Sequence, residues 1–407
     1  MLVPSLRAII AHSSRLPHAA ADLFYPPIMT KTIDRIPLLP YGLDAPRQLV
    51  VHRYGMRGAR PKAYLHASLH ADEIPAMLVL HHLVRLLDEA DRAGGIKGEI
   101  IVVPMANPIG VTQIVNARHV GRYELAGGGN FNRNWPDLFA GLADRVRDRL
   151  TDDAARNVTI IRTAMLADLE ARTAGSELAS LRLALARLAI DADIVLDCHC
   201  DSESLLHLFL IPAHWPTAAD LSAEIGSRAT LLSEESGGYA FDETFSTPWT
   251  RLARVLPDKP VPPACLSATV EYRGQAEVGD EWAEPDARAL LRFLQRRGLV
   301  AGDPGPLPQP QCEATRLDAC DVVRTPAAGI VAYKQPLGAM VTAGTVIAEI
   351  VDPTAVDARA ARTPVHTAAD GLLLSRRADK LVRPGDSLAK VVGSKTLPNR
   401  TGYLLED

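Results

Sequence analysis

The chain has 407 residues, of which 47% are apolar and 23% charged, values typical of a globular protein with more than one domain. Its net charge of -4 provides no large basic field, so we expect no nucleic-acid partner. No apolar run reaches the roughly 20 residues that a membrane-spanning helix needs, so we expect no membrane partner. The five cysteines, an odd number in a long chain, argue against a disulfide framework and favour the cytoplasm.

The N-terminal residues 1–28 differ from the rest. They are basic, contain Ala and Ser, and are nearly free of acids. They lack the long apolar core of a secretory signal. We expect a poorly ordered extension, with a transit-like peptide as the alternative.

A regular pattern begins at residue 47. Residues 47–55 and 62–69 are predicted as strands. Residues 72–92 have apolar side chains at helical spacing, and residues 98–108 resemble a short strand buried on both faces. Strand, helix and strand in this order predict a parallel βαβ unit.

The alternation of helices and strands continues to residue 298. Residues 138–188 are rich in Ala, Leu and Arg with charge pairs at helical spacing, which predicts helix. Pocket-shaping loops are expected around residues 233–249. The remaining predictions are strands at 192–201, 205–213 and 266–274 and helices at 217–235 and 284–298. The fold class is therefore α/β, with a mixed, largely parallel sheet flanked by helices.

A Pro-rich break at residues 302–311 separates a different kind of sequence. Residues 327–351 and 369–392 form a weak repeat of short apolar strands and glycine turns. This repeat predicts a compact β-sandwich or barrel of the lipoyl-like kind. The expected divisions are an extension at 1–28, an α/β domain at 29–301, a linker at 302–311 and a β-domain at 312–407.

Ligands of open α/β sheets gather beyond the carboxyl ends of the strands. His70 and Glu73 follow the strand predicted at 62–69 and begin the next helix. A metal could bind this pair. The alternative is that Glu73 stabilises the helix N-terminus and His70 is a solvated loop residue.

A second candidate lies in the strand predicted at residues 192–201. Alternation puts Asp197, His199 and Asp201 on one face and the two cysteines of this strand on the other. A histidine beside acids at the end of a buried strand suits a zinc ligand with a carboxylate partner. A buried histidine that is only hydrogen-bonded is the alternative.

Two further groups carry charge. Arg122, Asn132 and Arg133 lie in a Gly-rich loop, and Arg can pair with a carboxylate through two parallel hydrogen bonds. Glu271 ends the strand predicted at residues 266–274, where a carboxylate is costly unless it is paired, solvated or functional. A solvated loop and an edge glutamate are the alternatives.

Together these groups indicate a zinc hydrolase with one Zn²⁺ per chain. Two histidines and one glutamate leave a fourth position for water, whose pKa zinc lowers to about 7. A separate glutamate would move the proton, and an arginine would stabilise the oxyanion.

The same elements resemble the succinylglutamate desuccinylase/aspartoacylase family, a branch of the carboxypeptidase A-like zinc hydrolases. HADE resembles the family's His-x-x-Glu zinc pair, and DCH its later zinc histidine. NRNWP, GRY and TVEYR resemble the substrate-carboxylate element, the transition-state arginine and the strand of the general base. The resemblance covers about residues 47–298. It implies the metal ligands His70, Glu73 and His199, the catalytic residues Arg122 and Glu271, and the substrate-binding residues Asn132 and Arg133.

Other candidates are given structural roles. We expect His66 to be a core residue or a partner of a ligand, and His81 and His82 to lie on the outer face of a helix. His207 and His214 could line the cleft. Lys380 lies inside the second half of the repeat, whereas a lipoylated lysine would lie between the halves.

The main hypothesis is an amidohydrolase that removes an acyl group from a small N-acylated amino acid. A zinc carboxypeptidase acting on peptides is the alternative, and a binding protein that kept the fold is a third. The acyl group, the amine and the oligomeric state, including a homo-oligomer, stay open.

Overall fold

A nine-stranded sheet forms the centre of this computed structural model, which describes residues 29–43, 45–398, 400–402 and 404. The extension predicted at residues 1–28 lies outside the described residues. Five of the eight strand pairings in this sheet are parallel, so the predicted mixed, largely parallel sheet is confirmed. In spatial order the strands are β1 (Thr32–Pro37), β2 (Gln48–Tyr54), β4 (Glu99–Val103), β3 (Lys62–Ala67), β9 (Ile194–Asp201), β13 (Leu266–Gly274), β11 (His207–Leu210), β12 (Thr230–Leu232) and β14 (Ala314–Arg316).

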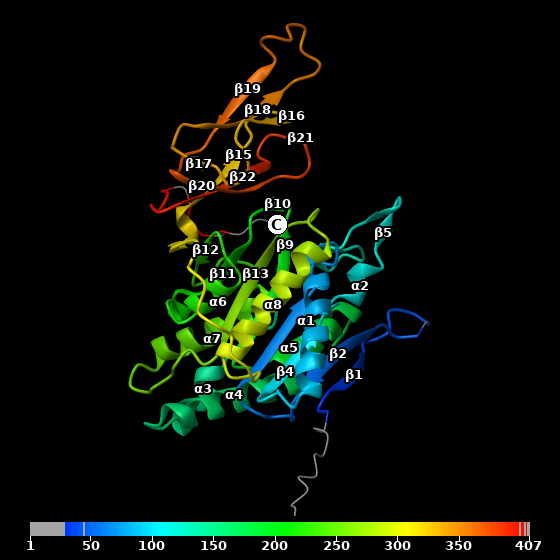
Figure 1. Cartoon of the computed structure of the whole chain (residues 1–407), viewed down its shortest axis with the longest axis vertical. Helices are drawn as coiled ribbons and strands as arrows, with labels where there is room; N and C mark the ends of the chain where they lie inside the picture. The colour runs from blue at the N-terminus through cyan, green and yellow to red at the C-terminus, as the bar shows by residue number, and fades with distance from the viewer. Residues whose placement is uncertain (1–28, 44, 399, 403, 405–407) are drawn as a thin grey trace, which may run out of the picture.

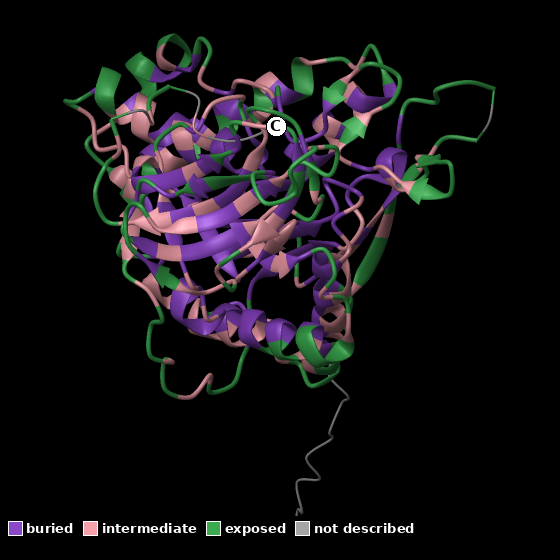
Figure 2. Ribbon diagram, turned by 90° about the horizontal axis from the view of Figure 1, so that it is seen from above, coloured by how far each residue is buried: buried purple, intermediate pink, exposed green. Residues whose placement is uncertain are grey.

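Helices cover both faces of the sheet (Figure 1). After Glu99, strand β4 is apolar because it is buried on both faces. Ile100 and Val102 belong to one hydrophobic core, whereas Ile101 and Val103 belong to the other. Figure 2 shows largely buried strands in the middle of the molecule, with helices on either side of them. One face carries α1 (Pro75–Arg92), α6 (Ala219–Glu224) and α8 (Asp280–Arg296), and the other carries α3 (Leu142–Val146), α4 (Ala154–Ala171), α5 (Glu177–Ala189) and α7 (Phe241–Val255).

Two sequence predictions are wrong between residues 217 and 249. The helix predicted at 217–235 ends at Glu224, because Gly226 adopts a φ of +67° and the chain then forms β12. The loop expected at 233–249 becomes helix α7 from Phe241 onward, and this helix contains Pro248. The Ser, Thr and Pro residues of α7 have low helix propensity and favour a loop prediction, although Phe241, Phe245 and Trp249 form an apolar face at helical spacing.

Short elements connect the main ones. The Gly-rich region after β4 forms two small hairpins, which hold the loop of Arg122, Asn132 and Arg133. These connecting elements are α2 (Pro108–Val111), β5 (Ile114–Val115), β6 (Arg118–His119), β7 (Tyr123–Glu124), β8 (Gly129–Asn130), and the 3₁₀ turns η1 (Arg147–Arg149), η2 (Pro212–His214) and η3 (Leu317–Ala319).

The C-terminal strands form two antiparallel sheets at the end of the central sheet where β9 and β13 finish (Figure 1). Each part of the chain gives a strand to the other. Strand β14 pairs with β12 of the central sheet, while β10 (Glu203–Ser204) pairs with a C-terminal strand. The C-terminal strands are β15 (Cys320–Arg324), β16 (Gly329–Tyr333), β17 (Met340–Val341), β18 (Val346–Val351), β19 (Arg362–His366), β20 (Gly371–Arg376), β21 (Leu381–Val382) and β22 (Ser387–Gly393).

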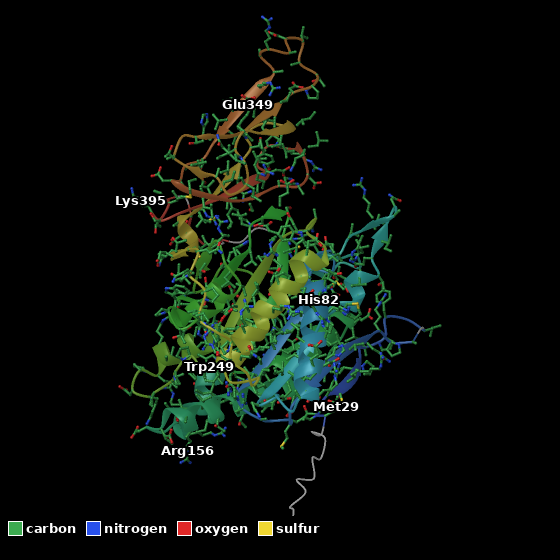
Figure 3. All side chains as sticks on the ribbon, viewed as in Figure 1. Met29, His82, Arg156, Trp249, Glu349 and Lys395 are labelled. Atoms are coloured by element: carbon green, nitrogen blue, oxygen red, sulfur yellow. The ribbon has the colours of Figure 1, made fainter. Side chains whose placement is uncertain are left out.

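Figure 3 shows where labelled residues of the two regions lie. Glu349 is among the C-terminal strands, whereas His82 and Trp249 are on helices beside the central sheet. None of the described helices is both long enough and apolar enough to span a membrane.

Candidate metal centre and active-site cleft

The candidate site lies where three parallel neighbours, β3, β9 and β13, end. His70 follows β3, and Glu73 lies just before α1. His199 is on β9 and stands directly across from Glu271 on β13. The topology therefore brings together residues that are far apart in the sequence.

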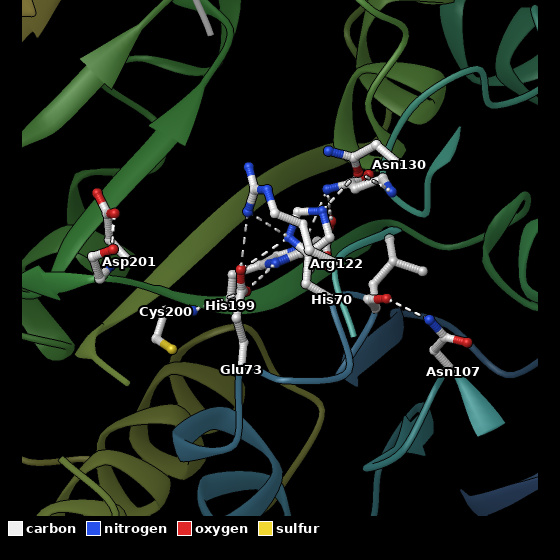
Figure 4. Close-up of polar contacts among 12 residues, drawn as sticks. His70, Glu73, Asn107, Arg122, Asn130, His199, Cys200 and Asp201 are labelled. Atoms are coloured by element: carbon white, nitrogen blue, oxygen red, sulfur yellow. Dashed lines mark hydrogen bonds and ion pairs between the residues drawn. The ribbon is translucent and has the colours of Figure 1, made fainter. Parts of the chain in front are cut away.

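His70, Glu73 and His199 form the candidate metal centre. All three are buried, and each offers one ligand atom within 4.8 Å of the other two. Glu73 bridges the two rings, with Oε1 at 2.9 Å from His70 Nδ1 and Oε2 at 2.7 Å from His199 Nδ1 (Figure 4). Two imidazole nitrogens and a carboxylate are a donor set that suits zinc.

The opposite nitrogen of each ring has its own acceptor. His70 Nε2 lies 2.8 Å from Asn130 Oδ1, an oxygen that also accepts the backbone N–H of Asn132. His199 Nε2 lies 2.8 Å from Asp197 Oδ1. Since these partners accept, each Nε2 carries the proton and each Nδ1 can present its lone pair to a metal. The residues present therefore fit a metal ion.

The charges of this cluster depend on one another. Burial by itself would raise the pKa of Glu73, but His70 and His199 outweigh it and hold that pKa below its ordinary value. Burial would lower the pKa of His199, yet Asp197 and Glu73 raise it well above its ordinary value. The two carboxylates thus favour the protonated form of the His199 ring, and a metal ion at Nδ1 would compete with that proton.

The three residues of the Gly-rich loop also reach the site. Arg122 lies over the metal centre, with one guanidinium nitrogen 3.3 Å from Glu73 Oε1 and 3.2 Å from His70 Nδ1 (Figure 4). Asn132 accepts the Phe241 backbone N–H at 2.8 Å and donates to Asp197 Oδ2 at 3.1 Å. The amide nitrogen also lies 3.2 Å from His199 Nε2.

Arg133 is buried and donates to the Asn132 carbonyl at 2.9 Å. Arg133 lines the same cavity as Arg122 and the candidate metal centre. The loop therefore supplies two guanidinium groups within reach of one ligand.

Glu271 faces this cavity from β13. Its Oε2 atom is buried and lacks a hydrogen-bond partner among the described residues. Burial first, and then the nearby Glu73, raise the pKa of Glu271 to about 8. A carboxylate poised to bind a proton near neutral pH is suited to proton transfer.

Both parts of the chain form the cavity, which has a volume of about 650 Å³. Ser375, Arg376 and Lys390 line it from the C-terminal strands. Lys390 Nζ contacts Asp201 Oδ2 at 2.6 Å, which ties β22 to the end of β9. The C-terminal part thus provides one wall of the cavity.

The other candidate residues lie elsewhere. His66 is fully buried, and its Nε2 contacts Asp197 Oδ1 at 2.7 Å, so it supports the carboxylate that holds His199. His81 is exposed, while His82 packs beside α8 and contacts Asp280 at 2.7 Å. His207 and His214 are buried outside the residues that line the cavity. Lys380 contacts Glu203 at 2.6 Å.

Sequence reasoning did not single out Asn130, the partner of His70. The two residues are 60 positions apart, and no spacing rule links them. The only local feature that marks Asn130 in the sequence is that it directly follows three glycines.

Comparison with known proteins agrees with the family resemblance of the sequence motifs. The model of the succinylglutamate desuccinylase/aspartoacylase catalytic domain matches residues 59–253. The chain is 27% identical to the N-alpha-acetyl-L-2,4-diaminobutyric acid deacetylase of Halomonas elongata, over 82% of this chain and 83% of that protein.

Solved structures agree with this result. A protein from Shewanella amazonensis, described as belonging to the succinylglutamate desuccinylase/aspartoacylase family, is 26% identical with a TM-score of 0.77, and the match covers 89% of this chain and 98% of that one. A counterpart from Shewanella frigidimarina shares the fold at 23% identity, with a TM-score of 0.79 over 90% of this chain and 98% of that one.

Proposed function

Because residues 59–253 match the catalytic-domain model of the succinylglutamate desuccinylase/aspartoacylase family, we propose that this chain is a member of that family and a zinc-dependent deacylase of small N-acylated amino acids. The observation that carries the proposal is the buried group of His70, Glu73 and His199, with Glu271 across the sheet from His199. The name of the deacetylase relative supports an N-acyl amino acid as the substrate class.

His70, Glu73 and His199 would hold the zinc ion. When bound, zinc supplies Lewis-acid chemistry, which acidifies water and polarises a carbonyl oxygen. Asp197 and Asn130 keep the Nε2 protons in place and so leave Nδ1 of each ring available.

The remaining residues would act on the substrate. Glu271 accepts a proton from the attacking water and delivers it to the nitrogen of the leaving amine. Arg122 donates to the oxygen of the scissile carbonyl as negative charge develops there. Arg133 and Asn132 hold a substrate carboxylate. The breaking bond is the amide C–N bond, and the products are a carboxylic acid and a free amine.

The domain divisions remain part of this proposal. Residues 29–301 would form the hydrolase domain, 302–311 the linker and 312–407 a lipoyl-like β-domain. The wall that β20 and β22 give to the cavity supports a preference for small substrates. A carboxypeptidase acting on peptides is the second candidate, because Arg133 could equally hold a C-terminal carboxylate. A cytoplasmic location fits the free thiols of the cysteines.

The central test is the substitution Glu271→Gln. We expect kcat for N-acyl amino acids to fall by roughly 10²–10⁴-fold, since the amide cannot accept the proton. Metal content, measured by elemental analysis, should stay the same. Glu281→Gln, on the exposed first turn of α8, is the matched control and should keep full activity. Undiminished turnover by Glu271→Gln would refute the assigned role.

A substrate screen addresses the reaction class. Zinc-loaded protein should hydrolyse N-acyl amino acids and lose this activity with a chelator, while peptides with a free C-terminus should be poor substrates. Efficient peptide cleavage would favour the carboxypeptidase alternative.

A further inference from the structure

Strand β13 contains an irregularity directly after Glu271. Residues 266–271 follow β9 in regular parallel register, with Glu271 across from His199. The next aligned pair joins Gly274 to Asp201, so three steps along β13 correspond to two steps along β9. One extra residue is therefore inserted into β13, and this β-bulge begins directly after the proposed proton acceptor.

The backbone of Arg273 within this bulge is strained. Its φ of +60° is a left-handed conformation that glycine adopts freely and that residues with a long side chain rarely adopt. This conformation costs free energy, so it persists only where surrounding contacts hold it. Contacts that fix Arg273 therefore fix the bulge as well.

Helix α8 supplies the contacts that hold Arg273. The two terminal nitrogens of its guanidinium group donate to the two carboxylate oxygens of Asp286, at 2.5 Å and 2.9 Å. Asp286 is buried, and the guanidinium carbon also lies 5.0 Å from the centre of the Trp282 ring. Two parallel hydrogen bonds and a stacked ring fix the orientation of the guanidinium plane. No described residue of α8 lines the cavity, so this clamp acts on the site from outside.

The chain is fixed on both sides of the bulge. After the bulge, the Gln275 backbone N–H donates to the Ser202 carbonyl at 3.0 Å, and a Cβ atom at Gly274 would lie 2.8 Å from the same carbonyl oxygen. Before the bulge, Val270 is fully buried in the core of the sheet. Glu271 is the last residue in regular register between these anchors. A change in the bulge would therefore displace Glu271 first.

We propose that Arg273 is a positioning residue, which Asp286 clamps so that the bulge aims Glu271 at the candidate metal centre. This inference rests on the proposed function, because Arg273 acts only through Glu271. Arg273 does not line the cavity and takes no part in the proton transfer. A displacement of about 1 Å at a reacting group can cost on the order of 100-fold in rate, so the position of Glu271 matters for turnover.

The test compares two substitutions of the same residue in the zinc-loaded protein. Arg273→Ala and Arg273→Gly both remove the clamp, but glycine adopts a positive φ without the steric cost that alanine meets. For the N-acyl amino acid that the wild type hydrolyses fastest, Arg273→Ala should lower kcat by roughly 10–100-fold with little change in KM. Arg273→Gly should keep kcat within about fivefold of the wild type, because the bulge forms without the clamp.

Arg292 provides a matched control. It pairs from α8 with the buried Glu224 at 2.7 Å, but its backbone is helical. Arg292→Ala and Arg292→Gly should both keep the wild-type kcat. Arg292→Gly should be the less stable of the two in urea denaturation, because glycine disfavours a helix. An advantage of glycine over alanine is therefore expected at Arg273 and not at Arg292.

A second pair of variants covers the case in which Arg273→Ala does not fold. Asp286→Asn keeps the size of the side chain and weakens the clamp, so kcat should fall by about 3–10-fold. The double variant Asp286→Asn/Arg273→Gly should regain the kcat of Arg273→Gly. A double variant no faster than Asp286→Asn would contradict the proposal.

The outcomes separate a positioning role from other roles of Arg273. Equal kcat values in Arg273→Ala and Arg273→Gly would overturn the proposal, whether both are low or both unchanged. Equally low values would mean that the side chain itself is needed, and equally high values would mean that the clamp serves stability alone.

Crystal structures of the two Arg273 variants distinguish this proposal from the deacylase function. Glu271 should stay across from His199 in Arg273→Gly and shift in Arg273→Ala, whatever the substrate. An unshifted Glu271 in Arg273→Ala would refute the positioning role. Failure of the wild type to hydrolyse any N-acyl amino acid would overturn the deacylase function and leave this structural comparison valid.

Discussion

Asp197 is a fully buried carboxylate with three partners. Its Oδ1 contacts His199 Nε2 at 2.8 Å and His66 Nε2 at 2.7 Å, and its Oδ2 accepts from Asn132 at 3.1 Å. The site thus depends on a residue that would not touch the metal. Asp197→Asn should weaken zinc binding by about 10–100-fold, measured by competition with a chromophoric chelator.

A matched control exists for this substitution. Asp91 is equally buried and accepts the backbone N–H groups of Thr30 and Lys31, away from the candidate site. Asp91→Asn should change stability but leave zinc affinity unchanged. Equal zinc affinity of Asp197→Asn and the wild type would contradict the assigned role of Asp197.

The raised pKa of Glu271 also predicts how stability depends on pH. In chelator-treated protein this pKa is about 8, whereas the ordinary value is 4.5. Between about pH 4.5 and pH 8, Glu271 is therefore protonated in the folded state and ionised in the unfolded state. The stabilisation is fully present below about pH 4.5 and is lost as the pH rises through 8.

Glu271→Gln removes this titration. Relative to the wild type, its free energy of unfolding should rise by on the order of 4 kcal/mol between pH 5 and pH 9, measured by urea denaturation in chelator. A difference that does not change with pH would show that Glu271 ionises normally.

At the level of elements, the loop between β3 and α1 is held by one buried asparagine. Asn107 Nδ2 donates to the Leu69 carbonyl at 2.8 Å, and its Oδ1 caps α2 by accepting from Gly110. The carbonyl that it binds belongs to the residue before His70. Asn107 therefore links the start of α2 to the position of a proposed metal ligand.

Asn107→Ala should cost about 1–3 kcal/mol of unfolding free energy and also reduce zinc affinity, because an unsatisfied Leu69 carbonyl lets the loop shift. Urea denaturation and zinc titration measure the two effects. Asn157→Ala is the control, since Asn157 is also buried and binds the backbone of Thr151 on both sides of its amide. That variant should lose stability alone. Loss of stability without loss of zinc affinity in Asn107→Ala would refute the link.

Elements with strong local patterns were predictable from the sequence. Strand β13 matches the prediction at residues 266–274, because its residues suit a pleated surface buried on both faces. Strand β12 was missed because Thr230–Leu232 is too short to show a period, and α7 was missed because its Ser, Thr and Pro residues favour loops and outweighed the helical spacing of Phe241, Phe245 and Trp249. The candidate ligands stand out in the sequence as polar side chains at strand ends, and the structure brings them together. Asn130 does not stand out, because packing between distant segments places it beside His70.

At the scale of the whole molecule, ion pairs join the C-terminal strands to β10, the short strand that follows β9. Glu203 contacts Lys380 at 2.6 Å and Arg376 at 2.9 Å, and Arg376 lines the cavity. Exposed ion pairs contribute little to stability, about 0–1 kcal/mol each. Their effect here should be on the position of the cavity wall.

Glu203→Gln should therefore raise KM by about 2–5-fold, with a small change in melting temperature. Steady-state kinetics and thermal unfolding measure both. Glu349→Gln is a close control, because Glu349 also contacts two cations at 2.8 Å, Lys334 and Arg362, but among the outer C-terminal strands (Figure 3). This control should keep the wild-type KM. Identical KM values in all three proteins would show that the wall does not depend on Glu203.

The register of β9 against β13 has a consequence for assembly. Glu271 faces His199 only while these strands keep one alignment, and a slip by a single residue would turn Glu271 to the opposite face. Recovery of turnover after denaturation thus reports the moment when both strands reach their final alignment. Chains that have regained helix content but not this alignment would remain inactive. The rate at which enzyme activity returns during refolding would therefore measure the rate of the last step of sheet formation.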